Sequence, residues 1–215
     1  VAHRVQRRLE PDPKVDFYEK PLVSKRNLAV LILLDVSGST GASHGARQVL
    51  DIEKHAAIVL GQGLHLLGDR FAVCGFSSNG CENCEYYRFK SFDESWNPHI
   101  WQRILAAYPR SSTRIGPALR HSAWLLSKID ARQRLIILVT DGQPMDSGYD
   151  PHTRYAQHDV RMACQESERA GIATYAISTE ENSLADLEIM FPRRRFSVLP
   201  DLAALPRVLP NLYLR

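Results

Sequence analysis

The sequence predicts an α/β fold with a doubly wound, mostly parallel central sheet and helices on both faces. Apolar, strand-like runs alternate along the chain with amphipathic, helix-like segments, which is typical of parallel sheets with crossover helices. Two of the runs, Leu28–Leu34 and Leu135–Thr140, are apolar without alternation, and each is followed directly by an aspartate. Continuous apolar strands are buried on both faces. Ligands of such sheets bind beyond the carboxyl ends of the strands, where these aspartates lie.

The predicted elements follow one another without an internal repeat. The first strand, Leu28–Leu34, leads into a polar turn rich in Gly and Ser, Asp35–Gly45. A long amphipathic helix is predicted next, and Gly68 ends it. Its apolar stripe is Val49, Ile52, Ala56, Val59, Gly63 and Leu66. Further strands are predicted at 71–76, 86–92 (an edge strand), 135–140, 172–178 and 196–199, and further helices at about 98–107, 117–129, 154–170, 184–190 and 202–212.

Composition and charge are those of one soluble domain. The chain has 215 residues, of which 44% are hydrophobic and 24% charged. The longest apolar run is far shorter than the roughly 20 residues that cross a bilayer, so no membrane span is expected. The net charge of +3 lies in residues 1–26, which hold seven Lys or Arg against four Asp or Glu. We therefore expect a basic arm or linker at 1–26, one domain at 27–215, and no nucleic-acid partner.

The strongest local signal is the sequence Asp35-Val-Ser37-Gly-Ser39 directly after the first strand. Its alternate residues bring three oxygen-bearing side chains into one tight turn, although Asp and Ser are also common in plain helix-capping turns. Thr113 lies just before a predicted helix, and Asp141 follows a second buried strand. In a doubly wound sheet these three loops should meet at one edge.

The residue types in this set indicate a hard metal ion. Two carboxylates and three hydroxyls, without imidazole or thiolate, suit Mg²⁺, with Mn²⁺ or Ca²⁺ as substitutes. The cysteines do not predict a zinc site, because Cys81 and Cys84 form one CxxC with no second pair. Four cysteines in this arrangement favour a reduced, cytoplasmic chain.

The residues of the candidate site resemble a known motif. Asp35-x-Ser37-x-Ser39, Thr113 and Asp141 look like the metal-ion-dependent adhesion site of a von Willebrand factor A domain, and the resemblance covers about residues 27–213. It implies that Ser37 and Ser39 bind the metal directly and that Asp35, Thr113 and Asp141 bind directly or through water. It also implies that the sixth position is left for a carboxylate from a partner protein.

A finer resemblance is to the C-terminal domains of the CbbO and NorD group. It rests on Gly68-Asp-Arg-Phe71, Gly75-Phe-Ser77, Tyr87-Arg-Phe-Lys90, Phe92-Asp-Glu94, Ser112-Thr-Arg114, Ala118-Leu-Arg-His121 and Leu209-Pro-x-Leu-Tyr213. Gly38 departs from the group, since many of those relatives are expected to have an acidic residue there.

The resemblance to this group implies a partner and a client. These bacterial domains work beside a MoxR-type AAA+ ATPase of the CbbQ or NorQ kind. CbbO with its ATPase reactivates inhibited rubisco, and NorD with its ATPase helps to mature nitric oxide reductase. We therefore expect a non-catalytic, cytoplasmic adaptor, with rubisco as the slightly preferred client and nitric oxide reductase as the alternative.

Catalytic interpretations fit less well. A haloacid dehalogenase-type phosphatase needs a second aspartate at the position of Ser37, as its general acid. The pair Gly61-x-Gly63 falls inside a predicted helix instead of opening one, and the chain has neither a Walker A motif nor a GxSxG elbow. A metal-dependent phosphohydrolase at the same edge is the alternative of another class, and a structural A-domain with an empty site is a third hypothesis.

Four further residues are candidates for contact with a partner. They lie in loops expected to border the metal, and loops carry a large share of binding residues. The candidates are His44, Ser78, Asn79 and Gln143. A plain turn is the competing interpretation for the loop that contains Ser78 and Asn79.

Overall fold

The computed structural model describes residues 27–41, 43–44, 47–150, 152–191 and 195–199, so the expected arm at 1–26 and helix at 202–212 lie outside the described residues. Its main sheet has six strands in the order β5-β4-β1-β6-β7-β8. The strands are β1 (Leu28–Asp35), β4 (Arg70–Ser78), β5 (Cys84–Lys90), β6 (Gln133–Thr140), β7 (Ile172–Ser178) and β8 (Phe196–Val198). The helices are α2 (Val49–Leu67), α3 (Pro98–Leu105), α4 (Ile115–Ser127), α5 (Tyr155–Arg169) and α6 (Leu184–Met190).

The topology confirms a doubly wound, mostly parallel sheet. β1 pairs in parallel with β4 on one side and with β6 on the other, and β7 and β8 continue in parallel. Only β5 is antiparallel, paired with β4 at the edge predicted from its polar alternation. From β1 the chain first adds β4 and β5 on one side and then crosses to add β6 on the other. The carboxyl ends of β1 and β6 therefore form a topological switch point, where such sheets bind ligands.

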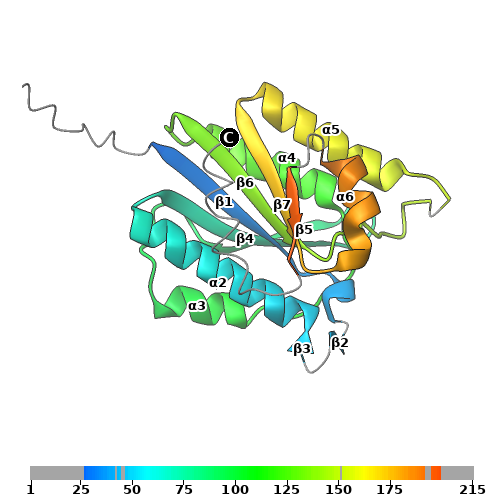
Figure 1. The fold of residues 1–215 in the computed structure, drawn as a ribbon, viewed down its shortest axis with the longest axis horizontal. Helices are drawn as coiled ribbons and strands as arrows, with labels where there is room; N and C mark the ends of the chain where they lie inside the picture. The colour runs from blue at the N-terminus through cyan, green and yellow to red at the C-terminus, as the bar shows by residue number, and fades with distance from the viewer. Residues whose placement is uncertain (1–26, 42, 45–46, 151, 192–194, 200–215) are drawn as a thin grey trace, which may run out of the picture.

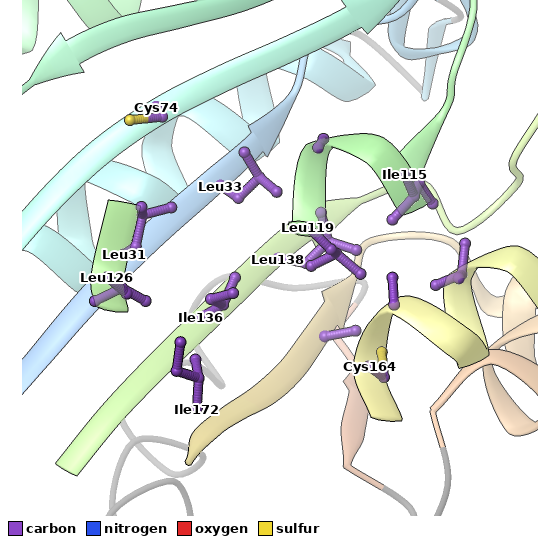
Figure 2. Close-up of a cluster of buried hydrophobic side chains, with 14 of the residues drawn as sticks. Leu31, Leu33, Cys74, Ile115, Leu119, Leu126, Ile136, Leu138, Cys164 and Ile172 are labelled. Carbon is purple, nitrogen blue, oxygen red and sulfur yellow. The ribbon is translucent and has the colours of Figure 1, made fainter. Parts of the chain in front are cut away.

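The sheet separates two layers of helices (Figure 1): α2 and α3 cover one face, and α4, α5 and α6 cover the other. Side chains of β1 alternate between the two cores. Leu31 and Leu33 pack under α4 and α5 with Ile136 and Leu138 of β6, as Figure 2 shows, whereas the even-numbered residues of β1 face α2. This two-sided burial explains the continuous apolar runs of both strands. Among the described residues, no helix is long and apolar enough to cross a membrane.

The turn after β1 contains structure that its polar sequence did not predict. A 3-10 helix, η1 (Gly38–Gly41), begins three residues after the end of β1 at Asp35. The short antiparallel strands β2 (Ser43–His44) and β3 (Arg47–Gln48) then lead into α2.

The predicted apolar stripe of α2 was only partly right. Val49 and Ala56 are buried, but Val59 is 41% exposed and Leu66 is 76% exposed. The face turned to the sheet instead contains Leu50, Glu53, Ala57, Leu60 and Leu64, which are all buried. This stripe keeps the helical period but is displaced by about one residue, and it includes a carboxylate that an apolar pattern does not select.

Gly68 ends α2 in a left-handed conformation, with φ of 73°. Its amide donates to the carbonyl of His65, and an added Cβ would meet nothing within 4 Å. We therefore expect Gly68→Ala to lower the free energy of unfolding by about 1–2 kcal/mol through backbone strain alone. Gly68→Asn should cost less, because Asn tolerates this conformation. Urea unfolding of the two variants tests this, and equal losses would contradict it.

Candidate metal site at the carboxyl edge of the sheet

The end of β1 holds three of the predicted ligands in one turn. Asp35 is fully buried, and its Oδ1 accepts a hydrogen bond of 2.9 Å from the amide of Ser37. The hydroxyl oxygens of Ser37 and Ser39 lie 3.0 Å apart. Ser37 is buried and Ser39 is exposed. The oxygen-bearing side chains therefore extend from the interior to the surface, so that a cation held here could be reached from outside.

The end of β6 supplies the second carboxylate. Parallel pairing of Leu34 with Val139 places Thr140 beside Asp35, and the Thr140 hydroxyl donates to Asp35 Oδ2 over 2.8 Å. Asp141 follows directly and is 6% exposed. These contacts confirm that the two strand-end aspartates meet at one edge.

Gly142 allows the chain to turn away at this point. Its φ is 88°, and an added Cβ would lie 2.5 Å from the Cβ of Ser183. Its amide donates to the Thr140 hydroxyl over 3.0 Å. Both the left-handed backbone and the close approach require glycine after Asp141.

The loop before α4 brings the third set of residues to the same edge. Ser112 forms a two-way backbone bridge with Ser78 at the end of β4, with distances of 2.7 and 2.8 Å. The amide of Thr113 donates to the carbonyl of Met145 over 2.7 Å, and Thr113 is buried. The loops that carry Asp35, Thr113 and Asp141 therefore converge, as the order of the strands predicted.

Gly38, the departure from the CbbO and NorD pattern, also lies where loops meet. Its amide donates to the carbonyl of Ser111 over 2.7 Å. A Cβ at this position would lie 2.7 and 2.8 Å from the carbonyl oxygens of Arg110 and Ser111. An acidic side chain at residue 38 would therefore require the neighbouring loop to move.

Among the described residues, no cationic side chain offsets the charge of Asp35. The pKa of Asp35 is raised to about 7, because burial and the neighbouring carboxylate of Asp141 together outweigh the hydrogen bonds from Ser37 and Thr140. A divalent ion would remove this penalty. Among the described residues, no three His, Cys, Asp or Glu side chains are grouped to hold a metal. The hydroxyls would therefore have to complete the set, which fits Mg²⁺ with several retained waters.

A buried ion pair that the sequence analysis missed joins two of the loops. Arg114 Nε lies 3.1 Å from Asp146 Oδ1, and the side chains are 9% and 0% exposed. The other oxygen of Asp146 accepts from the Ser78 hydroxyl over 2.7 Å and from the Gly80 amide over 3.1 Å. The guanidinium also lies 4.3 Å from the ring centroid of Tyr149. Arg114 follows Thr113 directly, so this ion pair positions a predicted metal ligand.

Glu53 is a second residue that the sequence analysis missed. It lies in α2 and is fully buried. Burial raises its pKa well above the ordinary value, and the charges of Asp35, Asp141 and Glu180 raise it further. The helix packs against η1, β1 and β6, so Glu53 lies on the face of α2 that is turned to the sheet. An acidic residue three positions after Leu50 and four before Ala57, inside an apolar stripe, was the signal that could have identified it.

The four residues predicted to contact a partner differ in their positions. Asn79 and Gln143 are exposed beside the site. Ser78 is 2% exposed, and its hydroxyl is engaged by Asp146. The side chain of His44 lies outside the described part of the chain.

A hollow of about 210 Å³ borders the site. Gln143, Met145 and Asp186 are among its lining residues. Of these, Met145 is 66% exposed.

Comparison with known proteins agrees with this fold. The von Willebrand factor type A domain family matches residues 30–143. Protein NorD of Brucella suis biovar 1 (strain 1330) is 37% identical over 187 residues, covering 87% of this chain and 29% of the relative. Protein NorD of Stutzerimonas stutzeri is 33% identical, covering 85% of this chain and 30% of the relative. The chain thus spans about a third of the length of these relatives.

Solved structures share the fold at low sequence identity. The vWF domain of the type V pili tip protein Mfa5 from Porphyromonas gingivalis has a TM-score of 0.61 at 13% identity, over 88% of this chain and 96% of that one. The PilB minor pilin from Streptococcus sanguinis has a TM-score of 0.66 at 17% identity, over 89% of this chain and 61% of that one. The chain belongs to the von Willebrand factor type A domain family and resembles the NorD and CbbO group within it.

Proposed function

We propose that the chain is a non-catalytic, Mg²⁺-dependent protein-binding module. The observation that carries the proposal is the convergence of Asp35, Thr113 and Asp141 on one sheet edge that is open at Ser39. A cation bound by these residues would keep a coordination position for a carboxylate of a partner. Binding would then be reversible and dependent on divalent cations, because the metal forms the bridge.

The described contacts of the two serines support a binding role over hydrolysis. Ser37 and Ser39 hydrogen-bond to each other, and neither hydroxyl bonds to a histidine among the described residues. A serine nucleophile would require such a base. If the chain hydrolysed a generic phosphate ester with Mg²⁺, and Asp35→Asn abolished the turnover, the metal-dependent phosphohydrolase would replace this proposal.

In the cell, the module would act as an adaptor between a client and a MoxR-type AAA+ ATPase. The similarity to NorD proteins supports a role as an accessory protein for nitric oxide reductase maturation. We therefore place nitric oxide reductase first as the client, and rubisco, as in CbbO-type activation, second. The exposed Met145 beside the site offers an apolar contact next to the metal-bridged one.

Capture experiments with purified components test this function. The immobilised chain is expected to retain nitric oxide reductase and its MoxR-type ATPase in the presence of Mg²⁺. In EDTA, the amount of retained client should fall by about tenfold or more. Asp35→Ala should show the same loss in Mg²⁺, whereas Asp93→Ala, which removes an exposed carboxylate, should not. A parallel assay with rubisco and its ATPase distinguishes the clients. Equal retention of both clients with and without Mg²⁺ would reject the metal-bridged mechanism.

A further inference from the structure

Glu53 is a buried acid whose chemistry the predicted adhesion site does not use. Its side chain comes from α2, which packs against η1, β1, β4 and β6, the elements that surround the carboxyl edge. The residue is 0% exposed, and neither Oε1 nor Oε2 has a hydrogen-bond partner among the described residues. Its surroundings include the carboxylates of Asp35 and Asp141, both at the candidate site.

Such a residue is costly unless something binds it. A buried carboxylate without hydrogen bonds destabilises a fold by several kcal/mol, so native proteins almost always pair it or neutralise it. Among the described residues no ordinary partner reaches its oxygens: the neighbouring Lys54, whose side chain is 8% exposed, pairs with Asp51 at 3.2 Å. The remaining neighbours that act on its charge are themselves acidic. The unpaired oxygens of Glu53 therefore point to a positively polarised group that the described residues do not supply.

We propose that Glu53 is an outer carboxylate of the cation site, whose two oxygens accept hydrogen bonds from water molecules bound to the metal. Direct ligation is disfavoured, because no three acidic, His or Cys side chains of the described part of the chain are grouped to hold one ion. Mg²⁺ keeps several of its waters when a protein binds it, and these waters are strong hydrogen-bond donors. Buried acceptors beside the metal therefore orient the waters and the first ligands.

This assignment rests on the cation of the proposed function and adds one residue to it. Asp35 and Asp141 neutralise a divalent ion between them. Glu53 adds a third carboxylate on the α2 side of the edge, so the site favours a doubly charged cation over a singly charged one. It also leaves the exposed Ser39 side free for a partner.

Glu53→Gln tests the assignment, because it keeps the shape of the side chain and removes its charge. Calorimetric titration of Mg²⁺ and Mn²⁺ into the chain is expected to show about 10–100-fold weaker binding in the variant, the usual effect of removing an outer-shell partner. Asp51→Asn is the matched control: it removes one carboxylate from the same helix, at a side chain that is 45% exposed. This control is expected to bind both ions as the wild type does.

Thermal unfolding separates this role from a purely structural one. Without a divalent ion, Glu53→Gln should unfold at the same temperature as the wild type or higher, because the variant no longer buries an unpaired carboxyl group. With Mg²⁺, the wild type should gain stability and the variant should gain clearly less. A structural role would lower the stability of the variant equally under both conditions, which would overturn the assignment.

The remaining outcomes distinguish this inference from the proposed function. If the wild type binds Mg²⁺, Asp35→Ala does not, and Glu53→Gln binds as tightly as the wild type, then only the role of Glu53 is wrong. If neither the wild type nor Glu53→Gln binds Mg²⁺ or Mn²⁺, with or without acetate, both the metal site and the role of Glu53 are rejected.

Discussion

Mg²⁺ titrated into the wild-type chain is expected to bind at one site, and the variant with Asp35→Ala and Asp141→Ala is expected to bind none. The two carboxylates are the only charged members of the predicted ligand set, and Asp35 is fully buried. Without them the hydroxyls of Ser37, Ser39 and Thr113 cannot replace the hydration shell of a divalent ion. Isothermal titration calorimetry with Mg²⁺ and with Mn²⁺ measures the loss directly.

A matched control keeps the change in net charge and moves it away from the site. Asp93→Ala with Asp130→Ala removes two exposed carboxylates, and this variant should bind as the wild type does. Persistent one-site binding in the Asp35 and Asp141 variant would contradict the assignment of the ligands. If the wild type shows no heat, the titration is repeated with acetate, because a carboxylate should complete the coordination; no binding then would reject the site.

Asp146→Ala is expected to lower the free energy of unfolding by about 3–5 kcal/mol, the usual cost of removing one partner of a buried ion pair. It leaves the guanidinium of Arg114 buried without its carboxylate and removes the acceptor of Ser78 and Gly80. Since Arg114 adjoins Thr113, cation binding should weaken in the same variant. Urea unfolding and calorimetry measure the two effects.

An exposed ion pair provides the comparison. Glu166→Ala removes a carboxylate that pairs with Arg120 at 2.6 Å on the surface, where both side chains are more than a third exposed. Its cost should be about 1 kcal/mol or less, because water screens the pair and Arg120 keeps Asp159. Equal losses in the Asp146 and Glu166 variants would contradict the special cost assigned to the buried pair.

The contribution of Asp146 to the free energy of unfolding should also depend on pH. Burial acts to raise its pKa, but the hydrogen bonds from Ser78 and Gly148 and the guanidinium of Arg114 outweigh it, and the pKa is lowered overall. A carboxylate with a lowered pKa in the folded state stabilises the fold at any pH above the ordinary aspartate pKa. This stabilisation is lost as the pH falls through the lowered pKa of the folded state. The stability difference between the wild type and Asp146→Ala should therefore be full at neutral pH and narrow in acid.

Much of the fold could be predicted from the sequence because its signals are local. The unbroken apolar runs of β1 and β6 identified strands buried on both faces, and Gly68 marked the end of α2. The polar alternation of β5 predicted an edge strand, and the sheet order confirms it. The buried face of α2 could not be predicted exactly from the pattern. Many residues of this helix are apolar, so neighbouring stripes differ little in hydrophobicity.

The candidate ligands could also be found in the sequence, since Asp35, Ser37, Ser39, Thr113 and Asp141 all stand directly beyond strands or before a helix, where a parallel sheet gathers its loops. Only the tertiary structure shows which ion pair fixes the loops at this edge and which other charged side chains lie near it. Arg114 and Asp146 are 32 residues apart in the sequence, and they pair only after the loops have converged. Glu53 belongs to an ordinary helical segment, and its significance follows from burial beside other carboxylates. Charge and desolvation act through space, so the pattern along the chain predicted candidate ligands but could not predict the buried charged groups around them.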